Sequence, residues 1–136
     1  MRSLQVCLDS IPYAAWLGIT AEPESALRMR LVGNEKHLGN PILNAWHGGV
    51  LAGTLQAAMS AALMAANNLD EAPHLYELTT RYVGSSPITK PLTIEVNIVK
   101  SGRRVGFVAV TALAGSDPGK IVATAQASFR SSGQSG

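Results

Sequence analysis

The sequence predicts an α+β domain in which an antiparallel sheet wraps one long buried helix. The first observation is an alanine-rich apolar segment that runs from His47 to Asn67. The second is that the chain after Pro73 consists of strand-like segments of alternating apolar and polar residues, separated by glycine-containing turns. A helix that is apolar on most of its circumference needs a sheet curled around it, and this requirement leads to the predicted architecture.

The long helix is expected because alanine is the strongest helix former. Two of its sides are mainly apolar, Val50/Thr54/Met59 and Leu51/Leu55/Leu63. The apolar run over 50–66 is 17 residues long and contains three polar side chains, whereas a membrane-spanning helix needs about 20 strongly apolar residues. We therefore expect a buried helix in a soluble protein that has no membrane partner.

The first third of the chain carries weaker signals. Residues 4–8 predict a short helix that ends at the Ile11-Pro12 step, because the residue before a proline avoids helical backbone angles. In 26–32, apolar residues alternate with arginines, which predicts a half-buried strand. The glycine, asparagine and proline residues of 33–43 predict a loop.

Four strands are predicted after the helix, at 75–83, 92–99, 105–113 and 121–129. The turn Ser101-Gly102-Arg103 joins the second to the third, and a turn at 115–119 joins the third to the fourth. In the last strand, the odd-numbered residues from Ile121 to Phe129 are predicted to share one face.

Composition indicates a single domain over residues 1–130. The chain has 136 residues and a mass of 14.2 kDa, and 46% of its residues are hydrophobic while 15% are charged, against about 25% charged in typical domains. These values exclude a disordered chain and predict that a partner subunit covers part of the surface. The residues 131–136 have no apolar side chain and are predicted to form a flexible tail.

The charge and the cysteine count exclude several classes of protein. A net charge of +2, from 11 basic and 9 acidic residues, is too weak to predict a nucleic-acid partner. Cys7 is the only cysteine, so an internal disulfide is excluded, and we expect a small core residue in a reducing, cytoplasmic compartment. We expect no signal peptide, because Asp9 interrupts the apolar run that one would need. No spacing predicts a metal site, and no phosphate-binding or dinucleotide motif is present.

The most informative segment is His47-Gly48-Gly49, where the long helix begins. The first turn of a helix has unpaired N–H groups and the positive end of the helix dipole, and glycine lets a ligand approach them. Such a site could polarise a carbonyl oxygen. The residues alone favour a plainer interpretation, in which the glycines form a tight turn and His47 caps the helix.

The run His47-Gly48-Gly49-Val50-Leu51-Ala52, followed by the alanine-rich helix, resembles the hotdog-fold thioesterases, and specifically the PaaI-type acyl-CoA thioesterases. The preceding Gly39-Asn40-Pro41 and the later Thr80-Arg81-Tyr82 fit the same group. The resemblance covers about residues 12–130. It implies a hotdog fold, an acyl-CoA ligand, no cofactor beyond the coenzyme A of the substrate, and a homodimer or a dimer of dimers.

In that family a glycine amide at the helix start, here Gly49, is the expected donor to the thioester carbonyl, and His47 shapes the turn or contacts the substrate. The catalytic Asp or Glu follows nine residues after the histidine, where this chain has Gln56. An amide cannot act as a base or a nucleophile, but it can orient a water or hold a carbonyl. The helix offers no Asp or Glu in its place; Glu77, more simply a solvated strand residue, and His47 are the remaining candidates.

The resemblance also implies residues that bind the substrate. Basic residues near the 101–105 hairpin commonly meet the phosphates of coenzyme A in this family, and Arg103 and Arg104 are the candidates here; two exposed arginines are the plainer interpretation. The other expected contacts are Asn40, Gly48, Tyr82 and Ser85, the last with Ser86 in the loop that holds the pantetheine arm. His37 and His74 are expected to be solvated loop residues.

Three functions remain open from the sequence. The first is an acyl-CoA thioesterase that hydrolyses a carbonyl held by the Gly49 amide. The second, which Gln56 favours, is a non-catalytic protein that binds acyl-CoA. The third is a hydratase or dehydratase, which would need a His/Asp pair that the sequence does not place.

Overall fold

The computed structural model describes residues 2–23, 27–102, 104–115 and 119–130. It has three α-helices in the described chain, α1 (Leu4–Ser10), α2 (Pro12–Leu17) and α3 (Gly48–Asn67), and one short 3-10 helix, η1 (Glu35–His37). The strands are β1 (Thr20–Ala21), β2 (Arg28–Leu31), β3 (Leu38–Asn40), β4 (Ala45–Trp46), β5 (His74–Tyr82), β6 (Leu92–Ser101), β7 (Val105–Ala114) and β8 (Lys120–Arg130).

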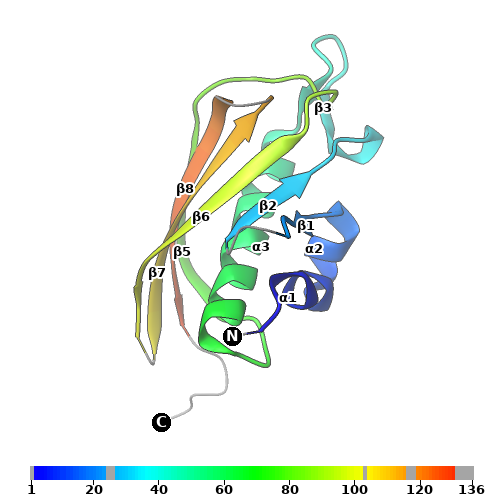
Figure 1. The fold of residues 1–136 in the computed structure, drawn as a ribbon. Helices are drawn as coiled ribbons and strands as arrows, with labels where there is room; N and C mark the ends of the chain where they lie inside the picture. The colour runs from blue at the N-terminus through cyan, green and yellow to red at the C-terminus, as the bar shows by residue number, and fades with distance from the viewer. Residues whose placement is uncertain (1, 24–26, 103, 116–118, 131–136) are drawn as a thin grey trace.

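The predicted α+β architecture is confirmed. A six-stranded antiparallel sheet in the order β1-β2-β6-β7-β8-β5 curves along one side of α3, and α1 and α2 pack on the other side (Figure 1). Strands β3 and β4 form a separate ribbon that leads into α3. The predicted tail, 131–136, and the predicted turn residues 116–118 lie outside the described residues.

The core of the molecule is α3, whose buried residues include Leu55, Ala58, Met59, Ala61 and Ala62, all of them completely enclosed. The helix is long and apolar enough to cross a membrane, but 72% of its most apolar window is buried inside the protein. It is therefore the core helix of a soluble-type fold. Its alanines let the sheet approach closely, because each side chain is a single methyl group.

The inner face of the sheet is built from small residues that pair across β7 and β8. Val108 and Val110 lie opposite Ala127 and Ala125, and all four are buried. The prediction that Ile121 shares this face is wrong. An irregularity between Ala112 and Leu113 shifts the register, so the inward position goes to the buried Val122 and Ile121 is 43% exposed.

The N-terminal region contains more structure than its sequence predicts. The opening helix α1 extends to Ser10, and α2 follows directly, with Pro12 in its first turn, where a missing N–H costs nothing. Gly18, at φ +88°, ends α2. Cys7, predicted as a core residue, is buried.

The segment 33–43, predicted as a loop, contains η1 and β3. The prediction that His37 is solvated is wrong, because this side chain is completely buried. Gly39 allows β3 to lie against the start of α3: a Cβ atom at this position would be only 2.7 Å from the Cα atom of His47. The segment thus forms the support for the turn that begins the long helix.

The sheet ends in an open edge on one side. Strand β5 pairs with β8 alone among the described strands, so its second edge has unpaired backbone groups. Along this edge Tyr76, Glu77, Thr79 and Arg81 are exposed. This edge lies at the opposite end of the strand order from β1, which packs against α1.

Candidate functional site

The start of α3 is capped by His47. The His47 Nδ1 atom accepts a hydrogen bond of 2.9 Å from the Gly49 N–H, and the His47 carbonyl accepts the first helical bond, 3.0 Å from the Leu51 N–H. The capping interpretation of His47 is therefore confirmed. A Cβ atom at Gly49 would be 3.0 Å from the imidazole Cε1, so glycine is what lets the ring lie against the helix.

This cap decides which amides a ligand can reach. The Gly49 N–H is engaged with His47, so a carbonyl could take it only if the imidazole moved away. The Gly48 N–H, one residue earlier, donates no hydrogen bond to the part of the chain that the structure describes. At the positive end of a 20-residue helix, this N–H is a ready donor to an oxygen atom that carries partial negative charge.

A pocket of about 270 Å³ lies beside this turn. It brings together four predicted residues, Gly48, Tyr82, Ser85 and Ser86, with Trp46, Leu51 and Val122, which sequence reasoning did not single out. The Tyr82 hydroxyl donates a 2.9 Å hydrogen bond to the Gly48 carbonyl, which fixes the end of β5 against the start of α3. We call this space the helix-start pocket.

A buried histidine supports the floor of the helix-start pocket. His37 Nδ1 accepts from the Asn34 N–H at 3.1 Å, so its Nε2 carries the proton and donates to the Leu17 carbonyl at 3.1 Å. Its ring stacks on Trp46, with the ring centres 5.3 Å apart. Burial lowers the pKa of His37, with the hydrogen bond to Leu17 opposing this change. The imidazole is therefore a neutral structural group.

Gln56 lies two turns along α3 and is half-buried. The spacing of three and four residues places Gln56 on the same helical face as Gly49 and Gly53. Tyr13 of α2 lies directly on this face, because a Cβ atom at Gly53 would be 2.9 Å from the Tyr13 hydroxyl oxygen. This face of α3 contains no Asp or Glu, and no local pattern in the sequence indicates that Tyr13 lies here.

Glu77 lies away from this face. It is exposed and lines a shallow groove on the outer surface of the sheet together with Thr79, Phe107 and Gln126. Its neighbour Leu78 packs against the core, and successive strand side chains point to opposite faces. The solvated interpretation of Glu77 is the one that the structure supports. His74, also predicted to be solvated, is exposed.

Of two further predicted contacts, Asn40 lies outside the helix-start pocket and Ser86 lines it. The Asn40 side-chain oxygen accepts from the Ile42 and Leu43 N–H groups, at 2.9 and 3.3 Å, so it organises its own turn. Ser86 is buried, and its carbonyl accepts a 3.2 Å bond from the Trp46 N–H. Ser86 therefore ties the 83–91 loop to the start of α3, and both Ser85 and Ser86 line the pocket.

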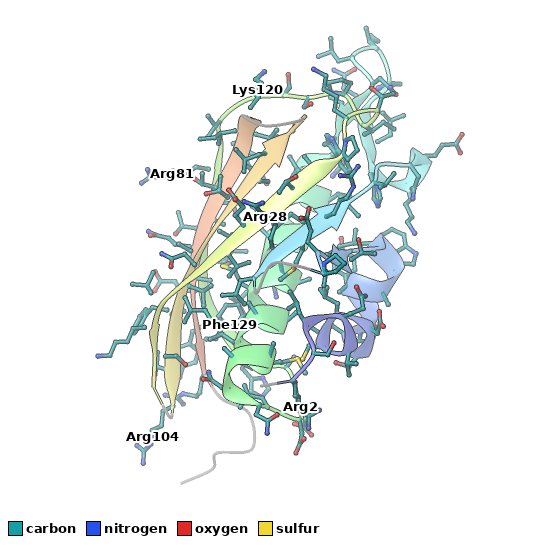
Figure 2. The ribbon with its side chains drawn as sticks, in the orientation of Figure 1. Arg2, Arg28, Arg81, Arg104, Lys120 and Phe129 are labelled. Atoms are coloured by element: carbon teal, nitrogen blue, oxygen red, sulfur yellow. The ribbon has the colours of Figure 1, made fainter. Side chains whose placement is uncertain are left out.

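The arginine hairpin lies at the far end of the molecule. Arg103 is outside the described residues, and Arg104 is exposed. The hairpin is next to the last residue of α3, because the Asn67 side chain donates to the Ser101 hydroxyl at 2.6 Å. A helix of 20 residues is about 30 Å long. Figure 2 shows Arg104 and Lys120 at opposite ends of the sheet.

The described residues contain no group of three or more His, Cys, Asp or Glu side chains that could hold a metal ion. The arrangement that remains is a helix start with one free amide, a pocket beside it, and a polar but uncharged side chain two turns on. Chemically, it can bind and polarise a carbonyl group.

Comparison with known proteins connects this geometry to a family. Residues 39–130 match the family of the acyl-CoA thioesterase N-terminal domain. A comparison with curated proteins finds no match.

Among solved structures, thioesterase superfamily member 2 from Mus musculus is 20% identical, with a TM-score of 0.76 over 96% of this chain and 98% of that chain. The zebra fish protein of the same name is 18% identical, with a TM-score of 0.74 over 93% and 91%. A protein from Chromobacterium violaceum is 25% identical, with a TM-score of 0.70 over 94% and 88%. These likenesses confirm the predicted hotdog fold.

The environment of His37 predicts how stability depends on pH. Because its pKa is lowered in the folded protein, the unfolded chain binds a proton first as the pH falls below about 6.5. The free energy of unfolding should therefore decrease from about pH 6.5 towards pH 5. Urea unfolding across this range measures it. His37→Gln keeps a donor for the Leu17 carbonyl but cannot titrate, so its decrease should be smaller; equal decreases in both proteins would contradict the prediction.

Proposed function

This chain belongs to the acyl-CoA thioesterase family of hotdog proteins, and from that premise we propose that it binds an acyl-CoA thioester in the helix-start pocket and hydrolyses it. The observation that carries the proposal is the Gly48 N–H, which has no partner in the described chain and lies at the positive end of α3 beside a pocket. A thioester carbonyl oxygen gains negative charge when its carbon is attacked, and such a donor stabilises that charge.

The proposed reaction is the attack of one water molecule on the carbonyl carbon. The new C–O bond gives a tetrahedral intermediate whose oxygen is held by the Gly48 N–H, and by the Gly49 N–H if His47 rotates away. The C–S bond then breaks, the acyl group leaves as a carboxylic acid, and the sulfur takes a proton to give free coenzyme A. No cofactor is needed beyond the coenzyme A of the substrate.

The water in this scheme lacks a strong base. Gln56 can position it by hydrogen bonds but cannot take its proton. His47 uses the lone pair of Nδ1 to accept from the Gly49 N–H, so it cannot serve as the base while it caps the helix. We expect slow hydrolysis for this reason. The alternative function, a non-catalytic protein that binds acyl-CoA, rests on the same absence of a carboxylate from α3.

The open edge of β5 supports a homodimer. Pairing of two β5 edges would satisfy their free backbone groups and would bring a second copy next to Tyr82, which contacts the start of α3. The outer face of the sheet carries a groove of about 380 Å³ with the exposed Val99 and Phe107, which suits a further dimer-to-dimer contact. The buried, unpaired Cys7 suits a reducing cytoplasmic compartment.

The same dimer gives the arginine hairpin a route to the site. His74 pairs with Arg130, and Arg130 pairs with Val105, so the hairpin lies at the His74 end of the sheet. Antiparallel pairing would place His74 of a second copy near Tyr82 of the first. The hairpin of the second copy would then be three strands away, or about 14 Å. Arg103 and Arg104 would meet the phosphates of coenzyme A across the subunits.

We predict that Gln56→Glu raises the rate of acyl-CoA hydrolysis. The new carboxylate has nearly the shape of the amide and can take a proton from water, an assistance worth about 10²–10⁴-fold. The rate constant is measured with a panel of short, long and aromatic acyl-CoA substrates. Gln126→Glu is the matched control, because Gln126 is exposed on the outer face of the sheet.

A half-buried carboxylate can cost stability, so folding and assembly of Gln56→Glu are checked first by circular dichroism and light scattering. A folded variant that is no faster than the wild type on any substrate would show that position 56 does not face the thioester. If the wild type is already fast and Gln56→Ala remains as fast, the catalytic group lies elsewhere.

The proposed pairing of two β5 edges predicts that a cysteine introduced on β5 will form a disulfide between subunits. Because Cys7 is buried and is the only cysteine, a new cysteine on β5 is the only reactive one at the edge. We expect at least one of Glu77→Cys, Thr79→Cys and Arg81→Cys to form a disulfide-linked dimer under mild oxidation, whereas Lys100→Cys at the far end of β6 should not. Light scattering should give at least twice the 14.2 kDa chain mass. A stable monomer at micromolar concentration would contradict the shared site.

The arginine hairpin is tested by ligand truncation. Replacing both Arg103 and Arg104 by alanine should weaken acyl-CoA binding by about 1–3 kcal/mol, because charge-assisted hydrogen bonds to phosphate are lost. The affinity for an acyl-pantetheine, which lacks the nucleotide, should hardly change. Titration calorimetry measures both affinities. Equal losses for the two ligands would assign the arginines to folding or assembly.

A further inference from the structure

A second pocket, of about 590 Å³, lies beside the first and is lined by three cations. We call it the basic pocket; its lining includes Arg30, Lys90 and Lys120, with Thr89, Thr93 and Gly115 between them. Among the residues that the structure describes, no Asp or Glu lines it. The chain as a whole carries a charge of only +2, so three cations around one pocket are a strong local concentration.

The register of the sheet explains why Arg30 faces no acid here. Arg28 and Arg30 both point outward from β2, opposite Glu95 and Thr93 of β6. Arg28 forms an ion pair with Glu95. Arg30, two residues on, therefore has an uncharged threonine as its direct neighbour across the strands. Its positive charge remains available at the rim of the basic pocket.

The two lysines come from the segments that close this end of the sheet. Lys120 begins β8, and its ammonium donates a 3.0 Å hydrogen bond to the Ser85 carbonyl, a neutral group that leaves the charge in place. Lys90 follows the turn that begins at Pro87, where its N–H donates to the Pro87 carbonyl at 3.1 Å. Both side chains are exposed, so both are accessible to an anion.

One loop forms a wall of both pockets. Gly84 and Ser85 line the helix-start pocket, and the Lys120 side chain lies across them: a Cβ atom at Gly84 would be 3.2 Å from the Lys120 Cε atom. Lys120 also lines the basic pocket. A ligand that leaves the helix-start pocket over Ser85 therefore reaches the three cations directly, at the end of the sheet where Figure 2 shows Lys120.

We propose that the basic pocket binds phosphate groups, and that these are the phosphates of the nucleotide end of coenzyme A bound to the same subunit. The identity of the ligand rests on the proposed function; the anion site rests on the three cations alone. Lysine and arginine are the side chains that bind phosphate through charge-assisted hydrogen bonds. Coenzyme A carries a diphosphate and a separate 3′-phosphate, so the arginine hairpin of a second copy would contact the phosphate group that the basic pocket leaves exposed.

The test compares Arg30→Ala/Lys90→Ala with the wild type by titration calorimetry. Lys120 is left intact, because it also holds the 83–91 loop through Ser85. The probes are coenzyme A, 3′-phosphoadenosine 5′-phosphate, inorganic phosphate and pantetheine. We expect the affinity for coenzyme A and for the nucleotide to fall about 10- to 100-fold and the affinity for pantetheine to stay within about twofold. Lys36→Ala, at an exposed lysine that lies over the Trp16 ring and lines neither pocket, is the matched control and should change none of them.

The outcomes separate this proposal from the proposed function. If the wild type binds the nucleotide, the double variant loses it, and no thioester is hydrolysed, the phosphate site stands while hydrolysis fails. If inorganic phosphate competes as well as the nucleotide does, the site takes free phosphate and its assignment to coenzyme A is overturned. If the double variant binds coenzyme A as tightly as the wild type does, or if the wild type binds no nucleotide, the basic pocket is not the phosphate site.

Discussion

The enclosure of α3 by the sheet is the constraint on which the rest of the structure depends. The alanines of this helix bring β7 and β8 close to its backbone, and the buried face leaves no room for charge. The same requirement shapes the chemistry. A carboxylate at position 56 would be half-buried and would need a partner, whereas the amide of Gln56 can remain there at little cost. Gln56, whose amide cannot act as a base, is therefore also the residue that an apolar helix accommodates at the lower cost in stability.

The functional end of this helix is held by contacts from outside it. The neutral ring of His37 stacks on Trp46 and links it to the Leu17 carbonyl, so α2, η1 and β4 are joined at one point. Gly39 lets β3 lie against His47, and Tyr82 joins β5 to Gly48. The Gly49 amide is taken by the His47 cap, whereas the Gly48 amide has no partner in the described chain and belongs to a residue that lines the helix-start pocket.

The 83–91 loop lies between two pockets that differ in charge. On one side is the helix-start pocket, whose lining has no charged residue, and on the other are Arg30, Lys90 and Lys120. A ligand with an uncharged acyl end and a phosphorylated end would place the first in the helix-start pocket and the second in the basic pocket. Specificity for such a ligand would come from the distance between the two pockets as much as from either one.

Periodicity and composition determined the layers of this protein. The alanine-rich run, the alternation in β6 to β8 and the family motif at His47 were sufficient for the α+β hotdog fold, because these are local patterns. They could not show that the Gly49 amide is taken by the His47 cap. Local patterns could not show that His37 is buried, that Val122 displaces Ile121 from the inner face, or that Arg104 lies a helix length from Gly48. Those facts depend on contacts between segments far apart in the chain. The basic pocket is of the same kind, since its three cations come from β2, the 83–91 loop and β8, and only the register of the sheet brings them together.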